Sequence, residues 1–280
     1  MKSTFIVVVL FASIFYLAFG CGGGGGGSGG GTDDFLDYTT VFTNNQFGYW
    51  NTAVRYTEPG PDSTWHTADD VIGLYTYVDR NPDNTRISWT RYIGYGIDGT
   101  WFTPDDLIDY YVEYLYTGGY MQWGRRYTPL DVMTSYFVYS RNLSNRATTM
   151  INYNGAGVDT NWFTADDLID YYVKYIYDAG GRSTTDEYYD SPGTDLTWFT
   201  PDDRLWGYYE MMYDSNGRPY RNVWHYGPTD EITVYYQLKR DSKGYVVREN
   251  RYNGPGSNGI WFQSVGSDML TFPDRSEYGE

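Results

Sequence analysis

The sequence contains one cysteine and two histidines among its 280 residues. The single cysteine, Cys21, allows neither an intramolecular disulfide nor a cysteine-based metal site. Two histidines, His66 and His225, are too few for most histidine-rich metal sites. His66 stands where equivalent loops carry phenylalanine, so we interpret it as a loop variant and not as a catalyst.

Basic residues are also scarce, with 20 Lys and Arg against 36 Asp and Glu, which gives a net charge of −16. Nucleic-acid binding needs Lys and Arg to replace the counterions of phosphates, so this composition argues against a nucleic-acid partner. An acidic balance suits a soluble surface and cation binding. Ala and Leu are uncommon, whereas Tyr, Thr, Val and Gly are frequent, and aromatics make up 20% of the chain. This composition favours strands and turns over helices.

The N-terminal segment has the pattern of an export signal. Lys2 precedes an apolar run, Phe5 to Phe19, which is short for a membrane helix and typical of a signal-peptide core. The run ends Ala18-Phe19-Gly20-Cys21, which resembles a bacterial lipobox, although Ala and Phe depart from its commonest residues. We therefore expect residues 1–20 to be a signal peptide and Cys21 to be lipidated. The alternative is an ordinary signal peptide that is cut nearby.

Residues 22–31 are nine glycines and Ser28. Such a segment cannot bury apolar surface, so we interpret residues 21–31 as the lipidated cysteine and a flexible tether. Residue 22 is Gly and not Asp, which by resemblance to Gram-negative lipoprotein sorting favours the outer membrane. We expect a protein of the bacterial cell envelope that contacts the membrane through its lipid anchor.

The rest of the chain is organised around a repeated stretch, Gly96 to Asp106, which reads GIDGTWFTPDD. Near-complete copies run from Gly60 to Asp70, Gly157 to Asp167 and Gly193 to Asp203, and a decayed copy runs from Gly256 to Asp268. A Tyr lies nine residues before each motif Trp, at Tyr56, Tyr92, Tyr153, Tyr189 and Tyr252, with equivalents at Tyr127 and Tyr226 before shorter loops. The spacing predicts modules of about 26 residues, some extended by a loop of about ten.

An alternating segment follows each Asp-Asp pair. Residues 108–116 place Ile, Tyr, Val, Tyr and Tyr on one parity, and the opposite parity contains Asp109 and Glu113. Period-two alternation predicts a strand with one buried face, and turn residues then lead to a second strand. We expect residues 32–280 to be an all-β domain of tandem antiparallel β-hairpin repeats. Those repeats would form an extended or spiralling sheet, or alternatively a closed barrel or propeller-like arrangement.

Two of the predicted turns, Tyr177 to Arg182 and Tyr213 to Arg218, resemble the YD repeats of the RHS family, and Arg240 to Gly244 is a weaker match. In that family, tandem hairpins form a long sheet that winds into a shell. The resemblance implies the hairpin architecture for this chain. It does not imply the enclosing function, because the Trp-Phe-Thr-x-Asp-Asp loops lie outside the YD pattern and the chain is too short to enclose a toxin.

The repeated acidic residues suggest two alternatives. Three carboxylates in one Gly-containing loop are the hard oxygen ligands that Ca²⁺ selects, and the candidate metal ligands are Asp62, Asp69, Asp70, Asp98, Asp105, Asp106, Asp159, Asp166, Asp167, Asp195, Asp202 and Asp203. Alternatively, Thr-Pro-Asp-Asp is the first turn of a helix, with Thr as the cap and Pro at the first helical position, and the loop is a capped turn whose Trp packs on its hairpin. Both readings can hold together.

No nucleophile elbow, phosphate-binding loop or His-Glu-x-x-His motif occurs in the sequence, so we predict that the protein is not an enzyme and has no catalytic residues. We expect a non-enzymatic repeat scaffold or interaction module, calcium-stabilised, whose partner is another envelope protein. The alternative is a carbohydrate-binding or cell-wall-binding module that uses exposed aromatics on a surface polysaccharide. Exposure of the motif Trp distinguishes the two, because a buried Trp favours a structural loop.

Overall fold

The structure, a computed structural model, describes residues 36–255 and 261–262. Contacts divide the chain into two units, Met1–Gly31 and Thr32–Glu280, and all described residues belong to the second. The predicted signal peptide, Cys21 and the glycine tether lie outside the described residues, and so does Asp268 of the decayed repeat.

The described residues form fourteen β-strands and no α-helix. The strands are β1 (Leu36–Asn44), β2 (Trp50–Glu58), β3 (Val71–Arg80), β4 (Arg86–Gly94), β5 (Leu107–Thr117), β6 (Tyr120–Tyr127), β7 (Met133–Arg141), β8 (Ala147–Gly155), β9 (Leu168–Tyr177), β10 (Ser183–Ser191), β11 (Arg204–Tyr213), β12 (Pro219–Tyr226), β13 (Glu231–Arg240) and β14 (Val246–Tyr252). In this part of the chain no helix is long and apolar enough to cross a membrane.

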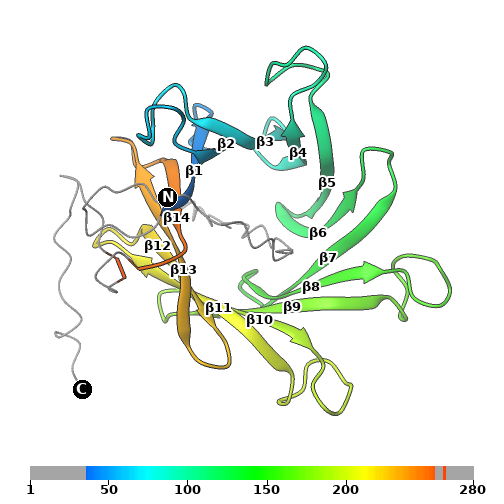
Figure 1. Cartoon of the computed structure of the whole chain (residues 1–280). Helices are drawn as coiled ribbons and strands as arrows, with labels where there is room; N and C mark the ends of the chain where they lie inside the picture. Colours follow the sequence, from blue (N-terminus) through cyan, green and yellow to red (C-terminus); the bar gives the residue numbers. More distant parts are fainter. Residues whose placement is uncertain (1–35, 256–260, 263–280) are drawn as a thin grey trace. The chain divides into compact units, whose positions relative to one another are not determined.

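Each strand pairs antiparallel with its neighbours in sequence, and the sheet closes because β1 pairs with β14 (Figure 1). The closing register places Thr39 opposite Asn250 and Val41 opposite Arg248. Closure leaves no unpaired strand edge. The prediction of an all-β fold of tandem antiparallel hairpins is confirmed, and the closed barrel is the arrangement that forms.

Ring contacts that skip a strand identify the concave face of the sheet. Tyr139 of β7 meets Tyr175 of β9 with ring centroids 6.3 Å apart, and Tyr209 of β11 meets Tyr236 of β13 at 6.0 Å. Side chains of strands two apart converge only on the inside of a curved sheet. Much of the aromatic parity predicted from the sequence therefore fills the interior.

The opposite parity is also partly buried, which the alternation pattern did not predict. Tyr172 lies on the same face as Lys174, yet it is 0% exposed, and Tyr75 and Tyr136 are buried too. The long loops cover these outer tyrosines, as described below. A loop that folds over a strand does not appear in the strand's own periodicity, so sequence alternation gives only one buried face.

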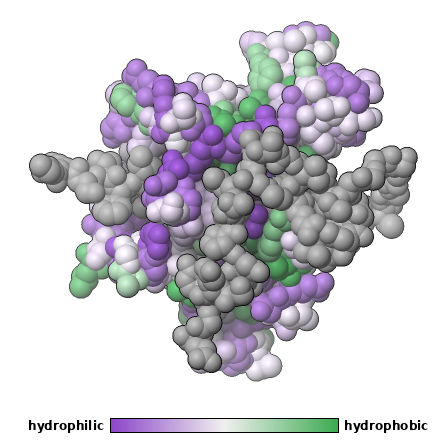
Figure 2. All heavy atoms as spheres, turned by 90° about the vertical axis from the view of Figure 1, so that its left-hand side faces the viewer, coloured by the Kyte–Doolittle hydropathy of each residue, from purple (hydrophilic) through white to green (hydrophobic). Residues whose placement is uncertain are grey.

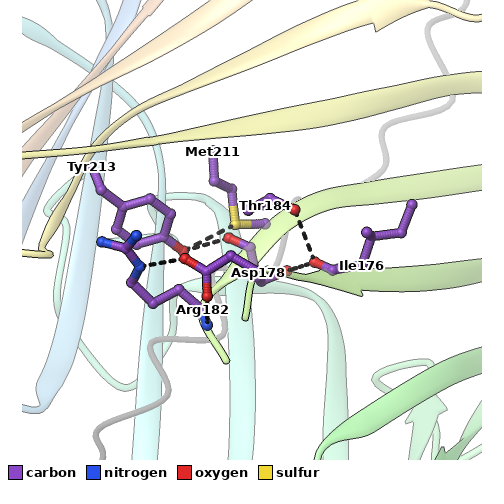
Figure 3. A network of polar contacts seen from close by, with 7 residues as sticks. Ile176, Asp178, Arg182, Thr184, Met211 and Tyr213 are labelled. Atoms are coloured by element: carbon purple, nitrogen blue, oxygen red, sulfur yellow. Dashed lines mark hydrogen bonds and ion pairs between the residues drawn. The ribbon is translucent and has the colours of Figure 1, made fainter. Parts of the chain in front are cut away.

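The short hairpin turns share one construction, which Figure 3 shows for the β9–β10 turn. The amide of Asp178 donates to the carbonyl of Arg182 (2.9 Å), and the Asp178 carboxylate accepts from the backbone and Nε of Arg182 (2.8 and 2.7 Å). Gly181 has φ +82°, a conformation that costs glycine little. Asp214 and Arg218 repeat this arrangement after β11.

The tyrosines that precede these turns connect consecutive hairpins. Tyr177 donates its hydroxyl to the carbonyl of Ala147 (2.7 Å), and Tyr213 donates to the carbonyl of Ser183 (2.5 Å). The Arg182 guanidinium lies 5.0 Å from the Tyr213 ring centroid. The Tyr-Asp pattern thus stabilises both the turn and the contact with the preceding hairpin.

Candidate functional site

Each loop that carries the Trp-Phe pair lies over a stacked aromatic pair on the outer face, whereas in the first long loop Thr39 stands opposite Tyr56. Tyr75 and Tyr92 on adjacent strands stack with centroids 4.4 Å apart and planes 6° apart. The second ring of each pair is one of the tyrosines that mark the repeat. The same stacking occurs in Tyr136–Tyr153, Tyr172–Tyr189 and Tyr235–Tyr252.

The motif Trp and Phe pack on the first tyrosine of each pair. Trp101 meets Tyr75 edge-on at 5.9 Å, and Phe102 meets the same ring at 4.6 Å with a tilt of 47°. The equivalent contacts are Trp162 and Phe163 on Tyr136, Trp198 and Phe199 on Tyr172, and Trp261 and Phe262 on Tyr235. These Trp are half-buried against tyrosine edges, so their geometry is that of a structural loop and not of an open stacking platform.

The second Asp of each pair is a buried hydrogen-bond acceptor. Asp106 Oδ2 accepts from the Tyr75 hydroxyl (2.7 Å), the Phe102 amide (2.7 Å) and the Thr103 amide (3.3 Å). Burial alone would raise the pKa of Asp106, but the hydrogen bonds from these groups outweigh it and lower the pKa. Asp167 and Asp203 accept the hydroxyls of Tyr136 and Tyr172 in the same way.

The first Asp of each pair is exposed and closes the loop across its base. Asp105 accepts from the Thr103 hydroxyl (2.7 Å) and from the Asp98 amide (3.2 Å). The hydrogen bond from Thr103 makes the largest contribution to lowering the pKa of Asp105, and the hydrogen bond from the Asp98 amide lowers it further. Asp98 in turn accepts from the Thr100 amide (2.8 Å). The other copies repeat this set at Asp62 and Asp69, Asp159 and Asp166, and Asp195 and Asp202.

The loop backbone explains the invariant glycine and corrects the helix reading. A Cβ on Gly96 or Gly157 would lie 2.2 or 2.3 Å from the backbone oxygen of the first Asp, so only glycine fits. The segment from Thr103 to Asp106 forms a single turn, closed by the Asp106 amide on the Thr103 carbonyl (3.2 Å), and β5 follows directly. The prediction that this segment begins a helix is wrong, because the Asp106 carboxylate bonds the Phe102 and Thr103 amides and no helical turn follows.

The twelve candidate metal ligands therefore fall into four equivalent loops, three to a loop. Among the described residues, no group of three or more His, Cys, Asp or Glu side chains is arranged to hold a metal ion. Nine of the twelve carboxylates bond loop amides or hydroxyls through the contacts above, and Asp70, Asp167 and Asp203 bond the amides of His66, Phe163 and Phe199. Calcium binding by these loops stays a prediction.

The first and the short loops vary this plan. In the first loop, His66 takes the Phe position with φ +73°, and its amide donates to Asp70 (2.8 Å). In the shortened loops, Tyr111 donates its hydroxyl to Asp131 (2.7 Å), and Tyr208 donates to Asp230. The ring that stacks on Tyr208 is His225, at 4.5 Å, which lies opposite it in the β11–β12 register, although spacing in the sequence marks Tyr226 as the equivalent of the other repeat tyrosines.

Comparison with known proteins leaves the family of this chain open. No protein-family model matches the sequence, and no curated protein matches it. Among solved structures, a DUF3836 family protein from Bacteroides vulgatus is 11% identical with a TM-score of 0.19, covering 48% of this chain and 90% of that one. A porin-like protein from Bacteroides uniformis is 9% identical with a TM-score of 0.31, covering 78% and 96%. The TcdB2-TccC3-Cdc42 structure is 10% identical with a TM-score of 0.27, covering 77% of this chain and 12% of that one. These similarities are too low to carry an argument about this chain.

Proposed function

We propose that the protein is a non-catalytic, lipid-anchored module of the bacterial cell envelope, in which the closed barrel is a scaffold and the rim of long loops binds another envelope protein. The observation that carries this proposal is a set of exposed apolar side chains on successive loops at one end of the barrel. Ile97, Leu130, Val158 and Leu196 are between 82% and 102% exposed. Exposed apolar side chains that share one surface often mark a binding site in soluble proteins.

The four side chains lie at the same end of the barrel because of the strand order. They belong to the connections after β4, β6, β8 and β10, and alternate connections of an antiparallel meander share one end. In the three long loops among them, the Asp residues bond their own loop, which holds each tip in a fixed position. On the face drawn in Figure 2, hydrophilic residues predominate and apolar residues form small separate groups.

The carbohydrate alternative receives less support from this geometry. It requires the motif Trp to offer open faces, and these rings are half-buried against tyrosine edges. Four equivalent loops also give no single asymmetric site for catalysis.

Photo-crosslinking in cells tests the proposal. A photoreactive amino acid placed at Val158 should give a discrete crosslinked partner, and the yield should fall when Ile97 and Leu196 are changed to Ser. The matched control is Leu143, which is equally exposed but lies in the β7–β8 turn at the opposite end. Equal crosslinking from Leu143 would show that the loop rim is not the binding surface.

The anchor is tested separately. Cys21→Ser should move the protein from the membrane fraction to the soluble fraction, because lipid attachment needs the cysteine thiol. Retention of the variant in the membrane fraction would contradict the lipid anchor.

A further inference from the structure

The outer face of β2, β3 and β4 carries a cleft of about 290 Å³ beneath the β4–β5 loop. Its walls are Thr52, Tyr75, Tyr77, Tyr92, Phe102 and Thr103. Aromatic rings dominate the walls, and Phe102 and Tyr77 are 53% and 48% exposed. No charged side chain lines this cleft.

The aromatic walls are held in place before any ligand arrives. Phe102 is fixed at φ +69° by the hydrogen bond from its amide to Asp106, and its ring packs on Tyr75. Tyr75 is fixed by its stack with Tyr92 and by its hydroxyl bond to Asp106. Ordering these rings therefore costs little when a ligand binds.

The equivalent space beside the other loops contains a cationic side chain of the protein itself. The Arg125 guanidinium lies 4.5 Å from the Phe163 ring centroid, and that of Arg221 lies 4.3 Å from the Phe262 centroid. The Lys174 ammonium lies 4.5 Å from the Tyr189 centroid. Each contact has the geometry of a cation–π interaction.

Strand register shows where each cation stands: Arg125 faces Tyr136 itself, whereas Lys174 and Arg221 stand at the register two residues beyond the first tyrosine. Each register pair joins the residue two positions after the first tyrosine with the residue opposite it on the preceding strand. These pairs are Tyr77 with Thr52, Val138 with Trp123, Lys174 with Thr149, and Gln237 with Arg221. In the first loop the corresponding pair is Val41 and Arg248. In that loop, burial lowers the pKa of His66, and the nearby charge of Arg248 lowers it further.

Beside the β4–β5 loop, Val54 stands at the position of Arg125, Tyr77 at that of Lys174 and Thr52 at that of Arg221, and none of the three is basic. None of the six residues that line the cleft is basic. We propose that this cleft binds the guanidinium or ammonium group of an external molecule, which takes the place that Arg125, Lys174 and Arg221 fill beside the sister loops. The proposal is independent of the apolar loop tips.

The electrostatics favour the same class of ligand. The carboxylate of Asp106 accepts the Tyr75 hydroxyl and the Phe102 amide, and it carries a negative charge at neutral pH because its pKa is lowered. The chain has a net charge of −16, which attracts cations and repels anions. A cation enclosed by tyrosine and phenylalanine faces is stabilised further when water is excluded.

Calorimetric titration of residues 32–280 with N-acetyl-arginine amide tests the proposal. The uncharged isostere N-acetyl-citrulline amide has nearly the same shape, and methyl glucoside is the sugar probe. We expect the arginine probe to bind at least about tenfold more tightly than the citrulline probe, which corresponds to about 1.4 kcal/mol. Absence of binding, equal affinity for the two isosteres, or tighter binding of the glucoside would each overturn it.

Three variants locate the site. Thr52→Arg should abolish binding, because the new guanidinium takes the register of Arg221, and Phe102→Ala should weaken binding at least about tenfold through loss of one aromatic wall. The matched control is Phe163→Ala, which removes the same ring from a loop already filled by Arg125. It should leave the affinity for the arginine probe unchanged while lowering the melting temperature as much as Phe102→Ala does. If Thr52→Arg folds and still binds the probe, the assignment is wrong.

Discussion

At the scale of single residues, the two adjacent Asp side chains of each long loop have different structural roles. Asp106 is buried and accepts from Tyr75, Phe102 and Thr103, whereas Asp105 is exposed and closes the base of its loop. The difference follows from strand geometry, since only the second Asp lies over the outer tyrosine. Sequence alone marked both as equivalent candidates for a metal, because a one-residue step in the loop decides which one is enclosed.

We expect Asp106→Asn to lower the free energy of unfolding by about 1–3 kcal/mol, because it replaces charge-assisted hydrogen bonds within a buried site. Asp105→Asn should cost less, since its carboxylate is exposed to water. Urea unfolding of the two variants provides the comparison. In the Tyr75→Phe background, the cost of Asp106→Asn should shrink, because the hydroxyl donor is already gone. An equal cost for Asp105→Asn and Asp106→Asn would contradict the separate roles assigned to them.

At the scale of elements, the repeated loops and hairpins were predictable because their signals are local. Alternation within residues 108–116 and turn residues such as Asp178 and Gly181 indicate hairpins without knowledge of distant contacts. The aromatic partner beneath each loop was not predictable in the same way. Tyr75 and Tyr136 lie on the outward parity in the first strand of the hairpin that leads into the loop, so their contacts depend on how the loop folds back over that hairpin.

The calcium prediction also belongs to the loop as a unit. If the four loops bind Ca²⁺, an ion bound only to the folded state stabilises it by about 2.7 kcal/mol at a hundredfold excess over its dissociation constant. We expect the melting temperature to rise with calcium and to fall with a chelator, and expect this response to shrink in the double variant Asp105→Asn with Asp106→Asn. Asp131→Asn, in a short loop, should lower the melting temperature without changing the calcium response. An unchanged melting temperature and no heat in a calcium titration would leave hydrogen bonding as the whole role of these residues.

At the scale of the whole molecule, barrel closure is the feature furthest from the sequence. It depends on β1 pairing with β14, for example Thr40 with Glu249, across nearly the full length of the domain. No periodicity or turn signal encodes such a pairing, so an open sheet and a closed one predict the same local pattern. Closure also creates an interior, in which titratable groups lose water that an open sheet would leave in place.

Two carboxylates on the inner face make the stability of the closed barrel depend on pH. Burial raises the pKa of Asp186 to about 7, against the opposing hydrogen bond from the Ser183 hydroxyl (2.9 Å). Burial likewise raises the pKa of Glu249 to about 7, although the charge of Arg55 lowers it in part. In an unfolded chain both groups titrate near pH 4. Between about pH 4 and pH 7 the folded state therefore holds more protons than the unfolded state.

Stability should consequently fall as the pH rises through this window, because folding is favoured where the folded state binds the extra protons. The pKa of Asp186 rises from about 4 in the unfolded chain to about 7 in the folded one, and this change contributes at most about 4 kcal/mol to the free energy of unfolding. We therefore expect the free energy of unfolding to fall by an amount on the order of 2–4 kcal/mol between pH 5 and pH 8. The lowered pKa of His66 opposes this loss within the interval, whereas the lowered pKa values of Asp105 and Asp106 act below pH 4. Urea unfolding at the two pH values measures the difference, and Asp186→Asn should reduce it because the amide does not titrate. A domain that becomes more stable from pH 5 to pH 8, or an Asp186→Asn variant with the full pH dependence, would show that these interior carboxylates stay charged in the folded barrel.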